Sequence, residues 1–118
     1  MTLICVRLLL MLMLTGCSNL FCSNDIIKEV VSPDGKFVAT VFDRNCGATT
    51  PYLRIVSLRA AKNSFDAESY NDWVFKIKGQ PKVEISWTAI DKLSINYAGS
   101  GEAPTLVDSW KEVKISYP

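Results

Sequence analysis

Four cysteines and scattered carboxylates are candidates for chemistry in this chain, which contains no histidine. This excludes histidine-assisted nucleophiles, histidine metal sites and histidine pH switches. The sequence also lacks a Ser-x-x-Lys pair, a Gly-x-Ser-x-Gly elbow and a glycine loop of the kind that binds phosphate. We therefore expect no catalytic residue, no metal site and no enzymatic activity.

Three carboxylates, Asp66, Glu68 and Asp72, lie close together in one polar stretch. Such groups serve elsewhere as an acid and base pair or as calcium ligands. No EF-hand order of ligands follows them, and acidic residues in a polar loop usually face solvent. We expect solvated side chains here, and hydrolysis at Asp66 and Glu68 is a formal alternative only.

The first residues have the features of a secretory signal peptide. Arg7 and the amino terminus are positively charged, and residues 8–14 are apolar throughout. This run is shorter than the roughly 20 apolar residues of a membrane span, and polar Ser18 and Asn19 follow soon after it. We predict that residues 1–16 form a helical signal peptide that is cleaved.

Residues 14–17, Leu-Thr-Gly-Cys, resemble the bacterial lipoprotein signature, in which a leucine and two small residues precede the modified cysteine. The resemblance implies that Cys17 carries a diacylglycerol and, in many bacteria, a third acyl chain; we expect no other cofactor. Two or three chains hold firmly, at about 0.8 kcal/mol per buried methylene. Ser18 implies the periplasmic face of the outer membrane if the host is Gram-negative. An ordinary secreted protein is the alternative.

Two cysteines remain after cleavage and lipidation, Cys22 and Cys46. Because exported thiol pairs usually oxidise, we predict a disulfide between them. Closing a loop of about 25 residues stabilises the fold by about 3.5 kcal/mol on the chain-entropy model. A free reactive thiol is the alternative. The bridge would hold the domain within about 17 Å of the bilayer, because five residues separate Cys22 from Cys17.

The charge balance excludes one class of partner. Loss of Arg7 leaves 12 basic and 12 acidic side chains, and no block of like charge stands out. Nucleic acids and acidic surfaces are bound through basic patches. We expect no nucleic-acid partner.

The elements that position these groups follow from a hydrophobic period of two, which is typical of strands with one buried face. We predict one β domain over residues 26–118, preceded by a lipidated tether over residues 17–25. Its fold class is all-β, a small sandwich or barrel of about seven antiparallel strands. The strands are expected at residues 26–31, 37–42, 52–58, 73–78, 82–87, 93–97 and 113–117.

Local signals refine this prediction. Residues 37–42 have apolar side chains at both odd and even positions, which predicts a central strand covered on both faces. Ser-Pro-Asp-Gly at residues 32–35 predicts a hairpin turn. The long connection at residues 60–71 is expected to hold one helical turn, around residues 65–69. The three tryptophans are expected in the core, although Trp110 breaks the alternation of its strand.

The Ser-Pro-Asp-Gly-Lys turn and the following strand resemble the hairpins of TolB-type propeller blades. A weak echo of it at residues 87–95 makes two blade-like units at most, too few to close a propeller. Residues 32–50, from this turn to Cys-Gly-Ala-Thr-Thr, also resemble a family of small bacterial lipoproteins of unknown function. That resemblance implies a β fold and the disulfide.

Two surface loops are candidates for binding, since loops on a rigid scaffold often carry function. One is the stretch after Cys46, expected to present its hydroxyls together with Arg44; the other is the glycine-rich loop of residues 97–104. The candidate residues are Arg44, Gly47, Ala48, Thr49, Thr50, Gly99, Ser100 and Gly101.

Together these features predict a membrane-anchored, non-enzymatic domain of the bacterial cell envelope that binds another envelope protein. One alternative is a module for a small ligand or glycan. Another is a lysozyme-type inhibitor, because the Gly99–Gly101 loop faintly resembles the serine-glycine loops of those lipoproteins. A concave polar pocket would favour a small ligand, whereas a flat apolar patch around Trp110 would favour a protein.

Overall fold

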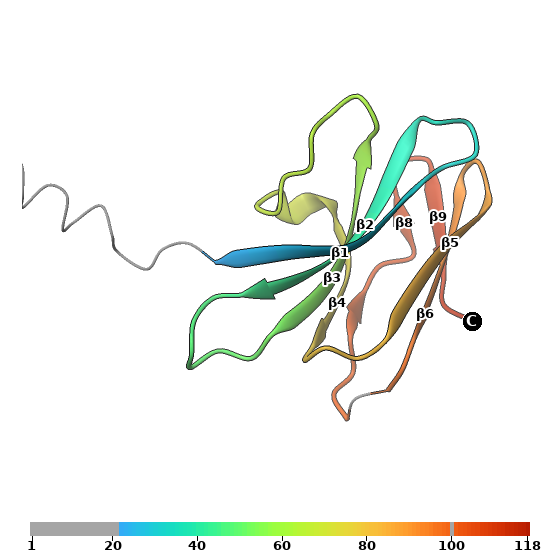
Figure 1. The fold of residues 1–118 in the computed structure, drawn as a ribbon. Coiled ribbons are helices and arrows are strands. Elements are labelled where there is room, and N and C mark those ends of the chain that lie inside the picture. Colours follow the sequence, from blue (N-terminus) through green and yellow to red (C-terminus); the bar gives the residue numbers. More distant parts are fainter. Residues whose placement is uncertain (1–21, 100) are drawn as a thin grey trace, which may run out of the picture.

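The computed structural model describes residues 22–99 and 101–118, so the expected signal peptide, Cys17 and Ser100 lie outside the described residues. Within this part, nine strands and one short 3₁₀ helix form two sheets that pack face to face (Figure 1). The prediction of an all-β sandwich is confirmed. Across the same residues, no helix has both the length and the apolar character needed to cross a membrane.

The first sheet contains five strands in the order β1-β2-β3-β4-β7, and every neighbouring pair is antiparallel. Four of them are the first four strands expected from the sequence, and the fifth is a two-residue strand that was not expected. Their bounds are β1 (Ser23–Val31), β2 (Phe37–Asn45), β3 (Leu53–Ala60), β4 (Trp73–Lys78) and β7 (Thr105–Leu106).

The second sheet contains four strands in the order β5-β6-β9-β8. Its one departure from the expected antiparallel arrangement is that β6 and β9 pair in parallel. The chain leaves β6, adds β7 to the first sheet and then returns, which brings β9 back in the same direction as β6. The bounds are β5 (Val83–Ala89), β6 (Lys92–Tyr97), β8 (Ser109–Trp110) and β9 (Val113–Ser116).

Strand β2 is buried on both faces, as its sequence predicted. Phe37, Ala39 and Val41 point into the core between the sheets, where they join residues of the second sheet. The side chains on the opposite face of the strand are buried too, since Thr40 and Phe42 are both 0 % exposed. Something must therefore cover the outer face of the first sheet.

That cover is the connection between β3 and β4, residues 61–72, which folds back beside the sheet (Figure 1). The ring of Phe65 lies 5.1 Å from that of Phe42, edge to face. The expected position of the helical turn, residues 65–69, was wrong: the 3₁₀ helix η1 spans Tyr70–Asp72 instead. The polar stretch before it makes isolated turns, in which the Asp66 carboxylate accepts a hydrogen bond from the Glu68 amide.

Two covalent and local predictions are confirmed at the ends of β1. Cys22 and Cys46 form a disulfide that ties the start of β1 to the residue after β2. At the other end, the Ser32 hydroxyl donates to Asp34 at 2.7 Å, and Gly35 has a φ of 77° that the hairpin turn requires. Both ends of the β1–β2 hairpin are thus fixed.

Candidate functional site

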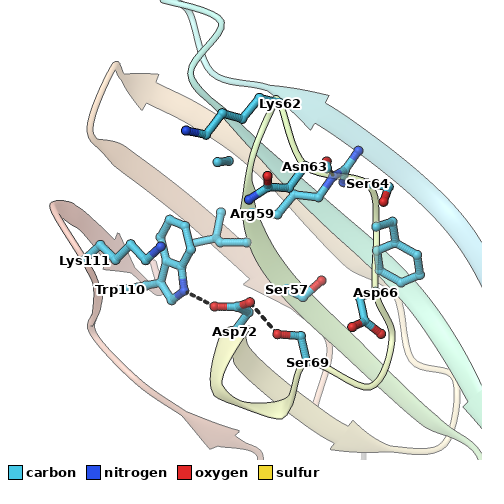
Figure 2. A pocket seen from close by; sticks show the side chains of 13 residues that line it. Ser57, Arg59, Lys62, Asn63, Ser64, Asp66, Ser69, Asp72, Trp110 and Lys111 are labelled. Carbon is cyan, nitrogen blue, oxygen red and sulfur yellow. Dashed lines mark hydrogen bonds between the residues drawn. The ribbon is translucent and has the colours of Figure 1, made fainter.

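The connection of residues 61–72 borders a partly open pocket of about 490 Å³, together with the end of β3 and the turn between β8 and β9 (Figure 2). This volume lies within the range of small-molecule sites, roughly 300–1,000 Å³. Nine of the thirteen residues that line it are polar or charged, and the four others are Leu58, Ala60, Phe65 and Trp110. The lining therefore suits a ligand with many hydrogen-bonding groups.

One wall of the pocket is a fixed chain of hydrogen bonds. The indole Nε1 of Trp110 donates to Oδ1 of Asp72 at 2.9 Å, and the Ser69 hydroxyl donates to Oδ2 at 2.6 Å (Figure 2). Because each of its carboxylate oxygens accepts one of these hydrogen bonds, Asp72 holds the side chains of Trp110 and Ser69 in place. Trp110 is 7 % exposed and belongs to the core cluster, which confirms the prediction for this residue and means that its ring contributes little to the surface.

The opposite wall is built around Arg59 at the end of β3. Its Nη1 donates to Glu29 at 2.8 Å and to the Thr40 hydroxyl at 3.0 Å, and its Nε donates to the Asn63 carbonyl at 2.9 Å. These bonds join β1, β2, β3 and the connection. The guanidinium is therefore held in place and largely neutralised by Glu29.

Two lysines complete the lining, Lys62 and Lys111. Among the residues that the structure describes, neither takes part in an ion pair. Lys111 has a φ of 49°, the one positive φ at a non-glycine residue of the described ranges, and its Nζ lies 4.9 Å from the Trp110 ring centre. Backbone strain of this kind is typical of functional sites.

Arg44 fixes the lower part of the connection. Its guanidinium donates to both carboxylate oxygens of Glu68, at 3.0 and 3.1 Å, and to Oδ1 of Asn24 at 3.1 Å. It also lies over the rings of Tyr70 and Trp73, 5.6 and 5.5 Å from their centres. The expectation that Arg44 is presented at the surface is therefore wrong. Arg44 is 6 % exposed, because its guanidinium is turned toward Asn24, Glu68 and the two rings.

This ion pair shifts the titration of its neighbours. The hydrogen bond from Arg44, with a second from the Tyr70 hydroxyl, lowers the pKa of Glu68. The same hydrogen bond to Glu68 raises the pKa of Tyr70. Glu68 is therefore both paired with Arg44 and solvated, as expected from the sequence, since its side chain is 56 % exposed.

The candidate loops lie away from the pocket. Gly47, Ala48, Thr49 and Thr50 are exposed after the end of β2, and none of them lines the pocket. The Thr50 hydroxyl donates to the Gly47 carbonyl at 3.0 Å, so it stabilises its own turn. Gly99 and Gly101 are exposed in the connection after β6.

The two candidate loops meet the same turn, between β4 and β5. The Gly79 amide donates to the Tyr52 carbonyl at 2.6 Å, and Lys78 pairs with Glu102 at 3.2 Å. These contacts bring both loops to one end of the sandwich, the end that carries the disulfide. The described glycines and threonines of these loops are exposed, and their role in binding stays a prediction; the pocket was not expected from the sequence.

The pocket residues that sequence reasoning missed are Ser57, Arg59, Lys62, Asn63 and Lys111. Their one available signal was the length of the polar connection after β3, since long connections are often functional. Nothing in the sequence indicated that the two-residue strand β8 would bring Trp110 and Lys111 to that connection. Their proximity is a product of the topology.

Metal chemistry has no support in the described residues, in which no group of three or more His, Cys, Asp or Glu side chains is placed to hold an ion. In comparisons with known proteins, no family model, curated protein or solved structure matches this chain. The pocket must therefore be interpreted from its own geometry.

Proposed function

We propose that this chain is a lipid-anchored, non-enzymatic binding domain of the bacterial cell envelope, and that it holds a small polar ligand in the pocket beneath residues 61–72. The observation that carries this proposal is the pocket itself, with its size, its polar lining and its fixed walls. The anchor and the periplasmic location rest on the lipoprotein-like residues 14–17.

The geometry favours a small ligand over an envelope protein, the partner expected from the sequence. An exposed apolar patch around Trp110 would have favoured a protein partner, but this side chain is buried and bonded to Asp72. The carboxylates near the pocket support binding rather than hydrolysis. Asp72 accepts two hydrogen bonds from neutral donors, and Glu68 is held by Arg44.

A ligand screen on the full chain in detergent tests the binding function. Sugars, amino acids, short peptides and polyamines would be added singly, and the melting temperature followed. We expect at least one polar compound to raise it, because a ligand that binds only the folded state stabilises that state.

A pocket-blocking variant shows where such a compound binds. In Asn63→Trp an indole would fill the pocket mouth, and the structural bond at this position uses the backbone carbonyl of Asn63, which the variant keeps. Ser116→Trp, at an exposed position of β9, is the matched control. The proposal requires the shift to disappear in the first variant and persist in the second; no shift from any compound, or a shift that survives in Asn63→Trp, contradicts it.

The anchor is tested separately by mass spectrometry of the protein taken from bacterial membranes. We expect the first residue to be Cys17 with two or three acyl chains, and Cys17→Ser to move to the soluble fraction. An unmodified Cys17 or a retained leader would remove the membrane from the proposal and leave the pocket untouched.

An envelope protein remains a second candidate partner because of one feature, the outer edge of β1. This strand ends the first sheet, and Ile26, Ile27 and Val31 on it are 47, 53 and 54 % exposed. An exposed edge strand can pair with a strand of another protein. Crosslinking in native membranes, with Ile27→Lys as the interfering variant, would test this interaction.

A further inference from the structure

The charged side chains of the pocket fall into two groups. Arg59 and Lys62 lie toward one end, at the end of β3 and the start of the connection, whereas Asp66 and Asp72 lie toward the other (Figure 2). Lys111 comes from the turn between β8 and β9 and lies beside Trp110. Lys62 and Asp66 therefore lie toward different ends of the pocket, while Lys111 lies beside Trp110, which bonds to Asp72.

Part of this charge is already used within the protein. Glu29 pairs with Arg59, and Asp72 has a hydrogen bond on each oxygen. Lys62 and Lys111 have no ion pair among the described residues. Asp66 accepts one hydrogen bond, at Oδ1 from the Glu68 amide, which leaves Oδ2 for another donor. The unused groups are thus two ammonium groups and one carboxylate oxygen.

From this arrangement, and resting on the proposed function, we infer that the pocket binds a small zwitterion, an amino acid or short peptide. Its carboxylate would lie against Lys62 and Lys111, and its ammonium group would donate to Asp66. The hydroxyls of Ser57 and Ser64 line the same pocket and offer hydrogen bonds to a peptide group between the two ends.

Other ligand classes fit the lining less well. A polyanion such as a phosphate ester would be repelled by Asp66 and Asp72. A neutral sugar could accept hydrogen bonds from both lysines, but it has no charge to pair with them or with Asp66. For stacking, the indole of Trp110 offers no open face, because it is buried and Lys111 lies over its ring; the other aromatic ring of the lining is Phe65. The zwitterion is the class that uses every free charge.

Calorimetric titration with three matched dipeptides tests this inference on the full chain in detergent at low salt. The probes are alanyl-alanine, its N-acetyl derivative, which keeps only the carboxylate, and its C-terminal amide, which keeps only the ammonium. We expect alanyl-alanine to bind about tenfold more tightly than either derivative, because each loses one charge-assisted hydrogen bond.

Variants assign the two ends. Lys62→Ala and Lys111→Ala should each weaken alanyl-alanine by about tenfold while leaving the C-terminal amide almost unaffected. Asp66→Asn keeps an oxygen acceptor for the Glu68 amide, so it should bind alanyl-alanine no better than the N-acetyl derivative. Lys92→Ala, at an exposed position of β6 that does not line the pocket, is the charge-matched control and should bind like the parent.

Failure of this inference differs from failure of the proposed function. The zwitterion inference is overturned if the N-acetyl derivative binds as tightly as alanyl-alanine, or if the lysine variants bind alanyl-alanine with the parent's affinity. A pocket for another ligand would then remain. The same holds if no dipeptide binds while a screened compound does, sensitively to Asn63→Trp. If neither the dipeptides nor any screened compound binds, both proposals fall.

Discussion

Asp43 and Arg54 face each other across β2 and β3, with side chains only 5 and 14 % exposed. Arg54 donates to both oxygens of Asp43, at 2.7 and 2.8 Å, and Gln80 adds a third hydrogen bond at 2.8 Å. Removing one partner of such a pair leaves the other charge buried, which is far more costly than the pair itself is favourable. At the residue scale, the fold therefore depends on charges placed inside the sandwich.

A pH dependence follows from this pair. The bonds from Arg54, with that from Gln80, lower the pKa of Asp43 below its ordinary value of 3.8. The carboxylate therefore stabilises the folded state at neutral pH, and this contribution is lost as the pH falls below that ordinary value. We expect Asp43→Asn to lower the free energy of unfolding by about 2 kcal/mol at pH 7, and by progressively less toward pH 3. Urea unfolding across this range measures it; a pH-independent difference would contradict it.

Lys111 separates stability from binding. Its φ of 49° costs a lysine about 1 kcal/mol, and glycine avoids this cost but gives back a similar amount in chain entropy. We expect Lys111→Gly to change the free energy of unfolding by less than about 0.5 kcal/mol, and yet to weaken alanyl-alanine binding about tenfold. Urea unfolding and calorimetry on one preparation measure both. A loss of stability that accompanied the loss of binding would instead assign Lys111 a structural role.

At the scale of elements, the strands and the connection differ in how far the sequence determines them. The alternation in residues 73–78 and 93–97 matches β4 and β6, and the doubly apolar run at Phe37–Phe42 matches the doubly buried β2. In these strands the hydrophobic pattern is visible in the sequence itself. The strands β7 and β8 have two residues each, too short to show any period, and only tertiary contacts define them.

The pocket could not be predicted from the sequence for the same reason. Arg44 was interpreted as a surface group because it follows a strand near a loop, yet it bonds to Glu68, 24 positions away. Trp110 and Asp72 are 38 positions apart. Contacts between an irregular connection and distant strands leave no local pattern in the sequence, and without them no pocket exists.

Arg44 is expected to keep the connection closed. Arg44→Met keeps an apolar stem over the rings of Tyr70 and Trp73 but removes the donors to Glu68 and Asn24. We expect it to weaken the connection by about 2 kcal/mol, equivalent to roughly 30-fold faster hydrogen exchange at the amides of residues 68–72. Amides of the β2–β3 ladder serve as the internal reference, and Lys92→Met as the control variant. Equal acceleration throughout the sheet would indicate a general loss of stability instead.

At the scale of the whole molecule, the two ends of the sandwich have different roles. The disulfide, the loop of residues 47–50 and the start of β1 share one end. Ala60 and Lys62 of the pocket lie near the start of β2, since Phe37 pairs with Ala60. The nine residues of β2 separate the two levels by about 26 Å. An anchor at Cys17 would therefore place the loop end nearest the bilayer and the pocket lysines farther away.

This orientation is measurable by NMR on the lipid-modified chain in nanodiscs that contain a gadolinium-chelating lipid. We expect amides of residues 47–50 to broaden much more than those of the turn at residues 33–36, because paramagnetic broadening falls steeply with distance. Cys17→Ser, which is expected to leave the bilayer, should lose the difference. Uniform broadening of both loops in the anchored protein would mean that the domain lies on its side or tumbles freely.

The position of the disulfide also determines how the domain would respond to mechanical load. A pull transmitted from an anchored N-terminus enters at Cys22, and the bond to Cys46 passes it directly to the end of β2. The hydrogen bonds between β1 and β2 are then bypassed, and the force reaches a strand that is buried on both faces. In a reducing environment the same pull would begin to separate β1 from its neighbour, starting beside Asn24, which accepts a bond from Arg44. Oxidation would thus make a tethered domain resistant to stretching at the point where it is attached.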